Sequence, residues 1–522
     1  MTDTAKPLSS PVFRALWIAT IVSNIGTWMH DVGAGWLMTS LSTNPLMVAL
    51  VQAATTLPMF ALALPAGALA DIVDRRRMLI GAQLFGLVAT ALLALATFGG
   101  ITTAPLLLAL TAAIAIGAAL SAPTFQAIVP ELVPAPALQQ AVALNSLGVN
   151  IARAIGPALG GVIIAAAGTG AVFALNAVSV VGVIAVIARW RRDVPQRHLP
   201  AEHFVGAMRA GVRFALRAPE LKAVLVRSIG FFLFASALWA LLPIVARRDL
   251  GLGPAGYGGL LTFMGLGAIA GAMLMPRLRA RLGANRTTVV ASLLLAGAMV
   301  ALAASHSFAA AAASLAAGGF AWIAMMASLN GGAQASSPAW VKARALAIYL
   351  LVFQGSMTAG STLWGGVAGA IGVPATLVLA AALLAAATLL LGWARPLDGM
   401  AKLDLAPSLH WPAPVFETEI EHDRGPVLVT IEYHVDPARV PAFFDAMQGM
   451  RRIRRRDGAI HWGLYEDVAE PGRVTETFTV ESWLEHLRQH DRVTNADRVQ
   501  QEALRAFQQD AAPPLVRHMV AR

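Results

Sequence analysis

Residues 48–77 read VALVQAATTLPMFALALPAGALADIVDRRR. The first 23 of these residues, 48–70, carry no charged side chain, whereas the last seven contain two aspartates and three arginines. A helix rises about 1.5 Å per residue, so about 20 apolar residues cross the hydrocarbon core of a bilayer. The pattern therefore predicts a transmembrane helix that ends in a short charged turn at the membrane surface.

Eleven further stretches have the same apolar character. They are residues 20–36, 79–98, 106–128, 138–166, 171–188, 223–246, 257–275, 289–304, 309–329, 346–369 and 374–393. A secretory signal would be one short apolar segment followed by a soluble body, but here the apolar segments continue to residue 393. We therefore expect an all-α polytopic membrane protein with 12 transmembrane helices and no cleaved signal.

Composition and charge exclude some classes of binding partner and of functional site. The chain is 57% hydrophobic and 13% charged. Residues 1–400 contain 24 Lys and Arg against 10 Asp and Glu, whereas residues 401–522 contain 15 against 19. The basic excess thus belongs to the loops between spans, and no nucleic-acid partner is expected. The absence of cysteine from the sequence excludes disulfides and thiolate metal sites or catalysis.

The distribution of Lys and Arg predicts the orientation of the spans. If the N terminus is cytoplasmic, nearly all loop Lys and Arg fall on the cytoplasmic side, and the opposite face receives only Arg247 and Arg248. This asymmetry follows the positive-inside rule, and an even number of spans returns the C terminus to the same side. We expect a multi-pass protein of the cell (inner) membrane with both termini in the cytoplasm.

The longest internal loop, residues 189–222, divides the spans into two groups of six. The predicted domains are an N-terminal half at 1–188, a cytoplasmic linker at 189–222 and a C-terminal half at 223–395. Two such halves suggest a duplicated transporter body with a substrate site near the bilayer midplane between them.

The charged turn after residue 70 contains Asp71, Asp74 and three successive arginines. This turn resembles the loop signature of the major facilitator superfamily, although that family often has a basic residue at position 72 and a glycine at position 74. The resemblance implies the fold of that superfamily and a turn that holds the cytoplasmic side closed. The residues that it assigns to gating are Gly67, Asp71, Asp74, Arg75 and Arg76. The alternative is that the arginines only anchor the topology.

The fifth span contains Gly156, Pro157, Gly160 and Gly161. Small residues let membrane helices approach closely, and proline bends them. This motif resembles the span-five motif of proton-driven exporters, and residues 122–161 resemble the branch that includes the enterobactin exporter and other transmembrane secretion effectors. Plain helix packing is the alternative explanation of the motif.

Charged residues inside spans are costly in lipid and indicate a cavity or a partner. The candidates for proton coupling are Asp31 in the first span, Arg153 near the middle of the fifth span and Glu131 at the cytoplasmic end of the fourth. A structural role for Asp31 is the alternative.

Amide and aromatic side chains inside spans are candidates for the substrate cavity, because amides orient a ligand and rings bind its apolar parts. They are Asn24, Trp28, Gln52, Gln126, Asn145, Trp239, Asn330, Gln334 and Gln354. This set favours an amphipathic or aromatic substrate over a sugar.

The composition changes after residue 393. Residues 396–415 are rich in proline and small residues and indicate a linker, and residues 416–522 are soluble in character. We expect strands at 427–435, 459–466, 473–480 and 515–521, a helix at 440–455 and a broken helix at 482–507. The order βαββαβ is that of a ferredoxin-like fold. The segment resembles the dimeric α/β-barrel modules of antibiotic-biosynthesis monooxygenases.

Candidate acid or base groups in this tail are His434, His461, His486 and His490, with Trp462 and Trp483 able to flank a ligand. No cofactor motif or compact metal-ligand spacing accompanies them, and the pair at 486 and 490 equally fits a solvated helix face. We therefore expect no cofactor, no metal and no catalytic residue, and a tail that senses a ligand or dimerises.

The sequence as a whole favours a secondary active transporter that exports small amphipathic molecules, siderophore-like or drug-like, by alternating access and proton exchange. Its expected partners are the lipid bilayer, a small-molecule substrate and protons. No Walker-type phosphate loop is present, which disfavours ATP drive. The alternative is a membrane-anchored enzyme or a ligand-sensing transceptor that acts through the C-terminal domain.

Overall fold

The computed structural model describes residues 6–190, 204–398, 404–408, 410–411, 421, 423–509 and 514–521, without the side chains of residues 64, 68, 70–72, 135 and 204–207. The chain divides into two compact units. One comprises Met1–Leu199, Val226–Leu329 and Tyr349–Pro396, and the other comprises Pro200–Leu225, Asn330–Ile348 and Leu397–Arg522.

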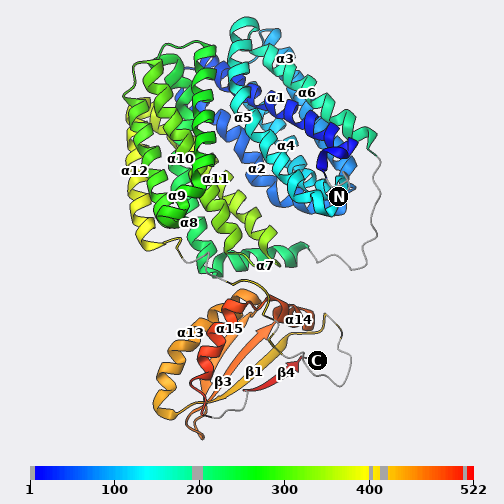
Figure 1. The fold of residues 1–522 in the computed structure, drawn as a ribbon, viewed down its shortest axis with the longest axis vertical. Helices are drawn as coiled ribbons and strands as arrows, with labels where there is room; N and C mark the ends of the chain where they lie inside the picture. Colours follow the sequence, from blue (N-terminus) through cyan, green and yellow to red (C-terminus); the bar gives the residue numbers. More distant parts are fainter. Residues whose placement is uncertain are drawn as a thin grey trace. The chain divides into compact units, whose positions relative to one another are not determined.

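The first unit is built of long helices (Figure 1). The helices that build it are α1 (Pro11–Leu41), α2 (Pro45–Ile72), α3 (Arg75–Phe98), α4 (Ala104–Leu132), α5 (Leu138–Ala167), α6 (Thr169–Arg189), α8 (Pro219–Ile244), α9 (Pro254–Ala303), α10 (Phe308–Ala335), α11 (Lys342–Ile371) and α12 (Val373–Ala394). Among the described residues, 11 helices are long and apolar enough to span a membrane, judged by length and composition. Each of the 12 predicted apolar stretches lies largely or wholly within one of these helices.

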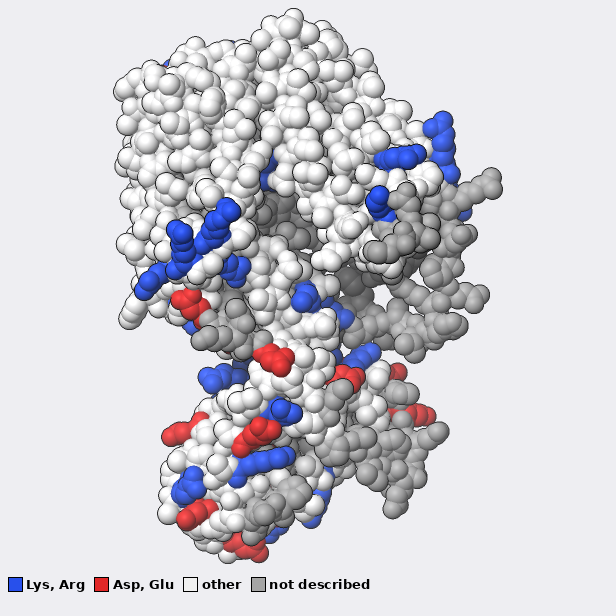
Figure 2. Space-filling model, in the orientation of Figure 1, with Lys and Arg blue, Asp and Glu red and all other residues white. Residues whose placement is uncertain are grey.

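The outer surface of these helices is apolar. Leu95, Phe98 and Trp393 are 68%, 62% and 83% exposed. On the face drawn in Figure 2, the surface of the helices is mostly free of charge, whereas side chains of both signs are present on the sheet-containing tail. Such a continuous apolar surface would be costly in water but matches a lipid environment.

Helix α9 contains two of the predicted stretches, 257–275 and 289–304. It runs for 50 residues without a loop, but Gly283 has φ 77° and ψ 172°, which breaks the helical path between the two stretches. A positive φ strains residues that have a Cβ, so glycine suits this position. At about 1.5 Å per residue, the whole of α9 has a contour of about 75 Å, more than twice the thickness of the hydrocarbon core.

Side chains cap the helices at the short turns. Asn44 accepts a hydrogen bond from the backbone N–H of Leu46 at 2.9 Å, and Asp74 accepts one from Arg77 at 3.0 Å. These carboxamide and carboxylate caps satisfy backbone donors that have no partner inside the helix. The turns between α1 and α2 and between α2 and α3 can therefore be only a few residues long.

The second unit contains a four-stranded antiparallel sheet in the order β2-β3-β1-β4. The tail runs β1 (Val427–His434), α13 (Val440–Asp457), β2 (His461–Glu466), β3 (Arg473–Val480), α14 (Trp483–Arg492), α15 (Asn495–Arg505) and β4 (Leu515–Val520). The strands and helices predicted for this segment are confirmed, with boundaries that agree within two residues. Helix α7 (Phe204–Arg217) also belongs to this unit.

One face of the sheet is buried. Val427, Val429 and Phe478 are at most 2% exposed, and they pack with Phe443 and Met447 of α13. Figure 1 shows α13 and α15 running along the sheet. The alternation of buried and half-buried residues along β1 and β3 is that expected of a sheet with one covered face.

A buried ion pair lies inside the tail. Arg454 of α13 donates two hydrogen bonds to the Glu476 carboxylate of β3, at 3.0 and 3.2 Å. The Tyr433 hydroxyl donates to the same carboxylate at 3.1 Å, and Trp462 Nε1 donates to it at 2.9 Å. Four donors to one carboxylate supply the hydrogen bonds that a buried charge requires.

Candidate functional site

A cavity of about 280 Å³ lies at the centre of the first unit. Its walls come from α1, α2 and α5 of the first six long helices and from α8, α9, α10 and α11 of the others. Its volume is close to the lower end of the range of about 300–1,000 Å³ that is usual for small-molecule sites. The cavity therefore lies between the two halves of the helical body, where both can contact one ligand.

One wall of the cavity is polar and charged. Asp31 on α1, Gln52 on α2 and Arg153 on α5 line it together. Among the described residues, Asp31 makes no hydrogen bond or ion pair. The guanidinium carbon of Arg153 lies 5.6 Å from the centre of the Trp28 ring, which also lines the cavity. Arg153 Nε is buried and has no hydrogen-bond partner in the described part of the chain.

Another part of the lining is aromatic. Trp322 of α10 lies 5.4 Å from Trp239 of α8 and 6.5 Å from Phe353 of α11, measured between ring centres, and both contacts are edge-to-face. All three residues line the cavity, and Phe232 packs behind them. Trp239 Nε1 is buried without a hydrogen-bond partner among the residues described. The aromatic residues thus give this part of the lining an apolar character.

Glycines of α5 bring this wall-forming helix close to its neighbours. A Cβ at Gly160 would lie 3.0 Å from Cα of Met29 on α1, and one at Gly156 would meet the Trp28 side chain. A Cβ at Gly161 would lie 3.0 Å from Cα of Gly258 on α9. The Gly156-to-Gly161 motif therefore packs α5 against α1 on one side and against α9 of the other half on another side.

Hydrogen bonds join the two halves at the end of α1. Arg247 lies in the π-helical turn Val245–Asp249 that follows α8, and it donates to Thr39 Oγ1 at 3.0 Å and to Ser40. Its guanidinium also lies 5.1 Å from the centre of the Trp36 ring. Because α1 crosses the body once between its N terminus and this end, these contacts lie on the face opposite the turn between α2 and α3.

That turn is held to its own half. Arg75 donates to Glu131 of α4 at 2.9 Å and to the Ala127 carbonyl at 3.0 Å, and Arg76 donates to the Ile187 carbonyl of α6 at 3.1 Å. The Asp71 backbone lies near the end of α2, but its side chain is outside the described residues. A Cβ at Gly67 would have no atom within 4 Å.

The structure thus places the predicted residues in several locations. The cavity brings together Trp28, Asp31, Gln52, Arg153, Trp239 and Gln354. Other candidates lie away from its lining: Asn24 and Asn145 are half-buried, Gln126 is exposed, Gln334 donates to Asn330 at 2.6 Å, and Glu131 pairs with Arg75.

Sequence reasoning missed several cavity residues. Tyr257 of α9 lines the cavity and stacks on Trp36 with 6.0 Å between ring centres, and Phe353 completes the aromatic wall. Tyr257 begins a predicted span and Phe353 lies inside one. An analysis of which residues share a helical face in these two spans could have identified them as cavity candidates.

The predicted residues of the tail lie at different depths. His434 and His461 are exposed, Trp483 and His486 are buried, and His490 is half-buried. His434 Nε2 lies 3.7 Å from a Glu432 carboxylate oxygen at the end of β1. The exposed imidazoles are not part of an enclosed site.

Comparisons with solved structures show the fold. A bacterial homologue of the human lysosomal transporter Spinster, inward-facing and unoccupied, is 16% identical with a TM-score of 0.60, over 75% of this chain and 97% of that one. A POT family transporter in complex with 5-aminolevulinic acid is 13% identical with a TM-score of 0.61, over 74% and 96%. A mutant of the nucleoside transporter NupG is 12% identical with a TM-score of 0.58, over 73% and 98%. No curated protein matches the chain.

A comparison with protein families gives one further finding. Residues 2–522 match the family described as transmembrane secretion effector. The match extends over the helical body and the tail alike.

Proposed function

Because the chain belongs to the transmembrane secretion effector family and is a membrane transporter of the major facilitator type, we propose that it exports small amphipathic molecules in exchange for protons. Members of such a transporter family are not enzymes, which agrees with the prediction made from the sequence. The observation that carries the proposal is the cavity between the halves, whose lining combines one carboxylate and one guanidinium with several aromatic rings.

The proposed topology has twelve spans. The chain is a multi-pass integral membrane protein, and α9 supplies two spans that are separated at Gly283, which makes the total even. The bias of Lys and Arg toward one side then supports cytoplasmic termini in the cell (inner) membrane. In this orientation the contacts of Arg247 with α1 lie on the outer side, and the turn with Asp71 is cytoplasmic.

We assign proton exchange to Asp31. This carboxylate lines the cavity, is half-buried and has no hydrogen-bond or salt-bridge partner among the described residues, so its proton can exchange with the cavity. Glu131 is the weaker candidate, because Arg75 already neutralises it outside the cavity.

The cavity also supports the proposed substrate class. Flat rings can stack against Trp239, Trp322 and Phe353, and Arg153 adds a guanidinium group to the same lining. Gln52 of α2 and Gln354 of α11 add amides to the lining. The likeness of residues 122–161 to the enterobactin-exporter branch supports siderophore-like or drug-like compounds and an outward direction.

The test is efflux from a host that lacks its own exporters, with a panel of aromatic and amphipathic compounds, measured with and without a proton uncoupler. We expect the chain to lower the accumulation of at least one compound, and the uncoupler to abolish this effect. In inverted vesicles, Asp31→Asn should abolish proton-driven uptake. The matched control is Asp249→Asn, an exposed carboxylate that does not line the cavity. Uncoupler-insensitive export, or full coupling in Asp31→Asn, would contradict the proposal.

For the tail we propose a ferredoxin-like domain that dimerises. The order βαββαβ and the strand order β2-β3-β1-β4 support this fold. The sheet face away from α13 carries Tyr465, Leu515 and Met519, which are 61%, 50% and 46% exposed. A second copy of the tail could bury these side chains. Light scattering of the detergent-purified protein should give a dimer that Leu515→Glu dissociates, and a monomeric wild type would contradict this role.

A further inference from the structure

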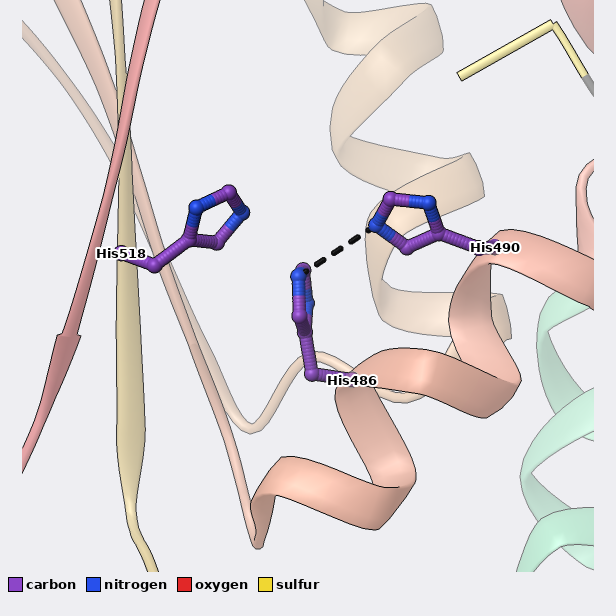
Figure 3. Close-up of side chains that lie close together, drawn as sticks. All are labelled: His486, His490 and His518. Atoms are coloured by element: carbon purple, nitrogen blue, oxygen red, sulfur yellow. Dashed lines mark hydrogen bonds between the residues drawn. The ribbon is translucent and has the colours of Figure 1, made fainter. Parts of the chain in front are cut away.

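Three histidines of the tail converge in space. His486 and His490 lie on α14, and His518 lies on β4. One ring nitrogen of each lies within 4.8 Å of the corresponding nitrogens of the other two, and Nε2 of His490 lies 3.3 Å from Nε2 of His486. Figure 3 shows the three rings directed toward one another across the space between the helix and the strand.

The secondary structure accounts for the convergence. His486 and His490 are four residues apart, which places them on the same face of α14. On β4, His518 pairs with Val429 of β1, which in turn pairs with Phe478 of β3, and both of these partners are buried against the helices. Residues directly opposite one another across a sheet share a face, so His518 lies on the face that the helices cover.

We propose that His486, His490 and His518 bind one divalent transition-metal ion of the Zn²⁺ type. In a tetrahedral site with Zn–N bonds of about 2.0–2.1 Å, two ligating nitrogens are about 3.3–3.4 Å apart. The two nitrogens on α14 already have this separation. His518 reaches the same geometry if its ring approaches by at most about 1.5 Å, which a side-chain rotation can supply.

The electrostatics of the cluster suit neutral imidazole ligands. Burial, together with the charges of the neighbouring histidines, lowers the pKa of His486 to about 3, and burial lowers that of His490 to about 4. Burial also lowers the pKa of His518. All three rings are therefore uncharged at neutral pH, and each has a lone pair for a metal. The charge of nearby Arg454, which is paired with Glu476, also lowers the pKa of His486 and His490.

The surroundings supply a second layer of contacts. Nδ1 of His486 is buried and makes no well-formed hydrogen bond among the described residues, and the same is true of both amide atoms of the fully buried Gln489 side chain beside it. A metal-bound imidazole usually donates its other N–H to a nearby acceptor, and the Gln489 amide is suited to this role. Trp483 and Trp411 flank the cluster, with ring centres 5.4 Å from His486 and 5.1 Å from His490.

The ligand set selects among metals. Imidazole suits Zn²⁺, Ni²⁺ and Cu²⁺, whereas Ca²⁺ and Mg²⁺ require oxygen ligands that the three histidines do not provide. Three protein ligands leave a fourth position for water or another small ligand. A bound ion would also join β4 to α14, whose Glu485 accepts a hydrogen bond from Arg213 of α7 at 3.1 Å within the same unit. The site does not depend on the proposed transport function.

The test uses the full-length protein, purified in detergent and freed of metal with a chelator. Calorimetric titration with Zn²⁺ should show one ion bound per chain, and Mg²⁺ should not compete. Co²⁺ should give the visible absorption of a four-coordinate nitrogen-ligated ion. His490→Ala and His518→Ala should each weaken Zn²⁺ binding at least tenfold and abolish the Co²⁺ spectrum.

The matched controls are His434→Ala and His461→Ala, which remove exposed imidazoles from the same domain. Both should retain the stoichiometry, the affinity and the Co²⁺ spectrum of the wild type. Near-ultraviolet circular dichroism of each variant shows whether the domain is still folded, so that loss of a metal-binding side chain can be distinguished from loss of folding. The proposal is overturned if the wild type binds no Zn²⁺, or if binding persists unchanged in a folded His490→Ala, His518→Ala double variant.

Discussion

Gly161→Ala should open the contact between α5 and α9. The added Cβ would lie 2.7 Å from the carbonyl oxygen of Pro254 and 3.0 Å from Cα of Gly258. Both atoms belong to the backbone of α9, so neither can rotate out of the way. Carbon atoms in contact prefer separations of about 3.5–4.0 Å, and the two helices must therefore move apart by about half an ångström or more.

The magnitude follows from the cost of overpacking. Inserting a methyl group into a close-packed contact costs about 1–3 kcal/mol when the surroundings cannot relax. The strain disappears in any conformer in which α5 and α9 separate at this end, so the whole cost falls on the closed conformer. The ratio of open to closed molecules should thus rise about fivefold to 150-fold.

Thiol labelling measures this shift. The sequence has no cysteine, so Val51→Cys, at a buried position that lines the cavity, supplies the only thiol. A membrane-impermeant reagent applied from the side of the α5–α9 contact should label this thiol at least fivefold faster in Gly161→Ala. The control is Gly182→Ala, where the added Cβ has no atom within 4 Å. Equal labelling rates in a folded Gly161→Ala protein would refute the reasoning.

Three further predictions follow from other contacts. Arg247→Ala removes the hydrogen bonds and the cation–π contact at the end of α1, worth about 1–2 kcal/mol, and should speed the same labelling about fivefold to 30-fold. Glu476→Gln removes the carboxylate that is hydrogen-bonded to buried Arg454 and should destabilise the tail by about 3–5 kcal/mol in urea unfolding. Burial raises the pKa of Asp497, but Arg456 and the hydrogen bonds from Thr494 together lower it more, so that the pKa lies below its ordinary value of 3.8. The carboxylate therefore stabilises the tail above about pH 4, and this contribution is lost as the pH falls through the folded-state pKa. Asp497→Asn should show a smaller loss of melting temperature between about pH 6 and pH 3.

Each of these variants has a control that makes the same chemical change at an exposed position. They are Arg277→Ala for labelling, Glu481→Gln for urea unfolding and Asp491→Asn for the pH series. If a control variant changes the readout as much as the test variant does, the effect comes from the loss of charge in general and not from the specific contact. If a test variant leaves its readout unchanged, the contact that it removes does not contribute to the measured property.

The helices were predictable because lipid imposes a single requirement on each span, a run of about 20 apolar residues. The break in α9 separates two predicted stretches, but its position at Gly283 was not predictable, because the hydropathy pattern does not specify backbone conformation. The strands of the tail were predictable for a similar reason, since β1 and β3 alternate between a covered and an uncovered face. Hydropathy and periodicity report burial, and burial determined these elements.

The cavity was only partly predictable because an amide in a span can face any direction. Gln52 and Gln354 line the cavity, whereas Gln334 bonds to Asn330 on its own helix. Span position alone could not distinguish these cases. His518 shows the same limit, because it joins the α14 histidines only through the pairing of β4 with β1, a contact between segments far apart in the sequence.

Helix α5 both lines the cavity and packs against α9. Arg153 lines the cavity, and its carbonyl oxygen would lie 3.4 Å from a Cβ at Gly265 of α9. Two turns later, Gly161 meets Gly258 of the same partner helix. A ligand that shifts the Arg153 segment must therefore also change the α5–α9 packing, since both contacts lie along one pair of helices. Binding energy released at Arg153 can then favour one of the two conformers, and this differential affinity is what alternating access requires.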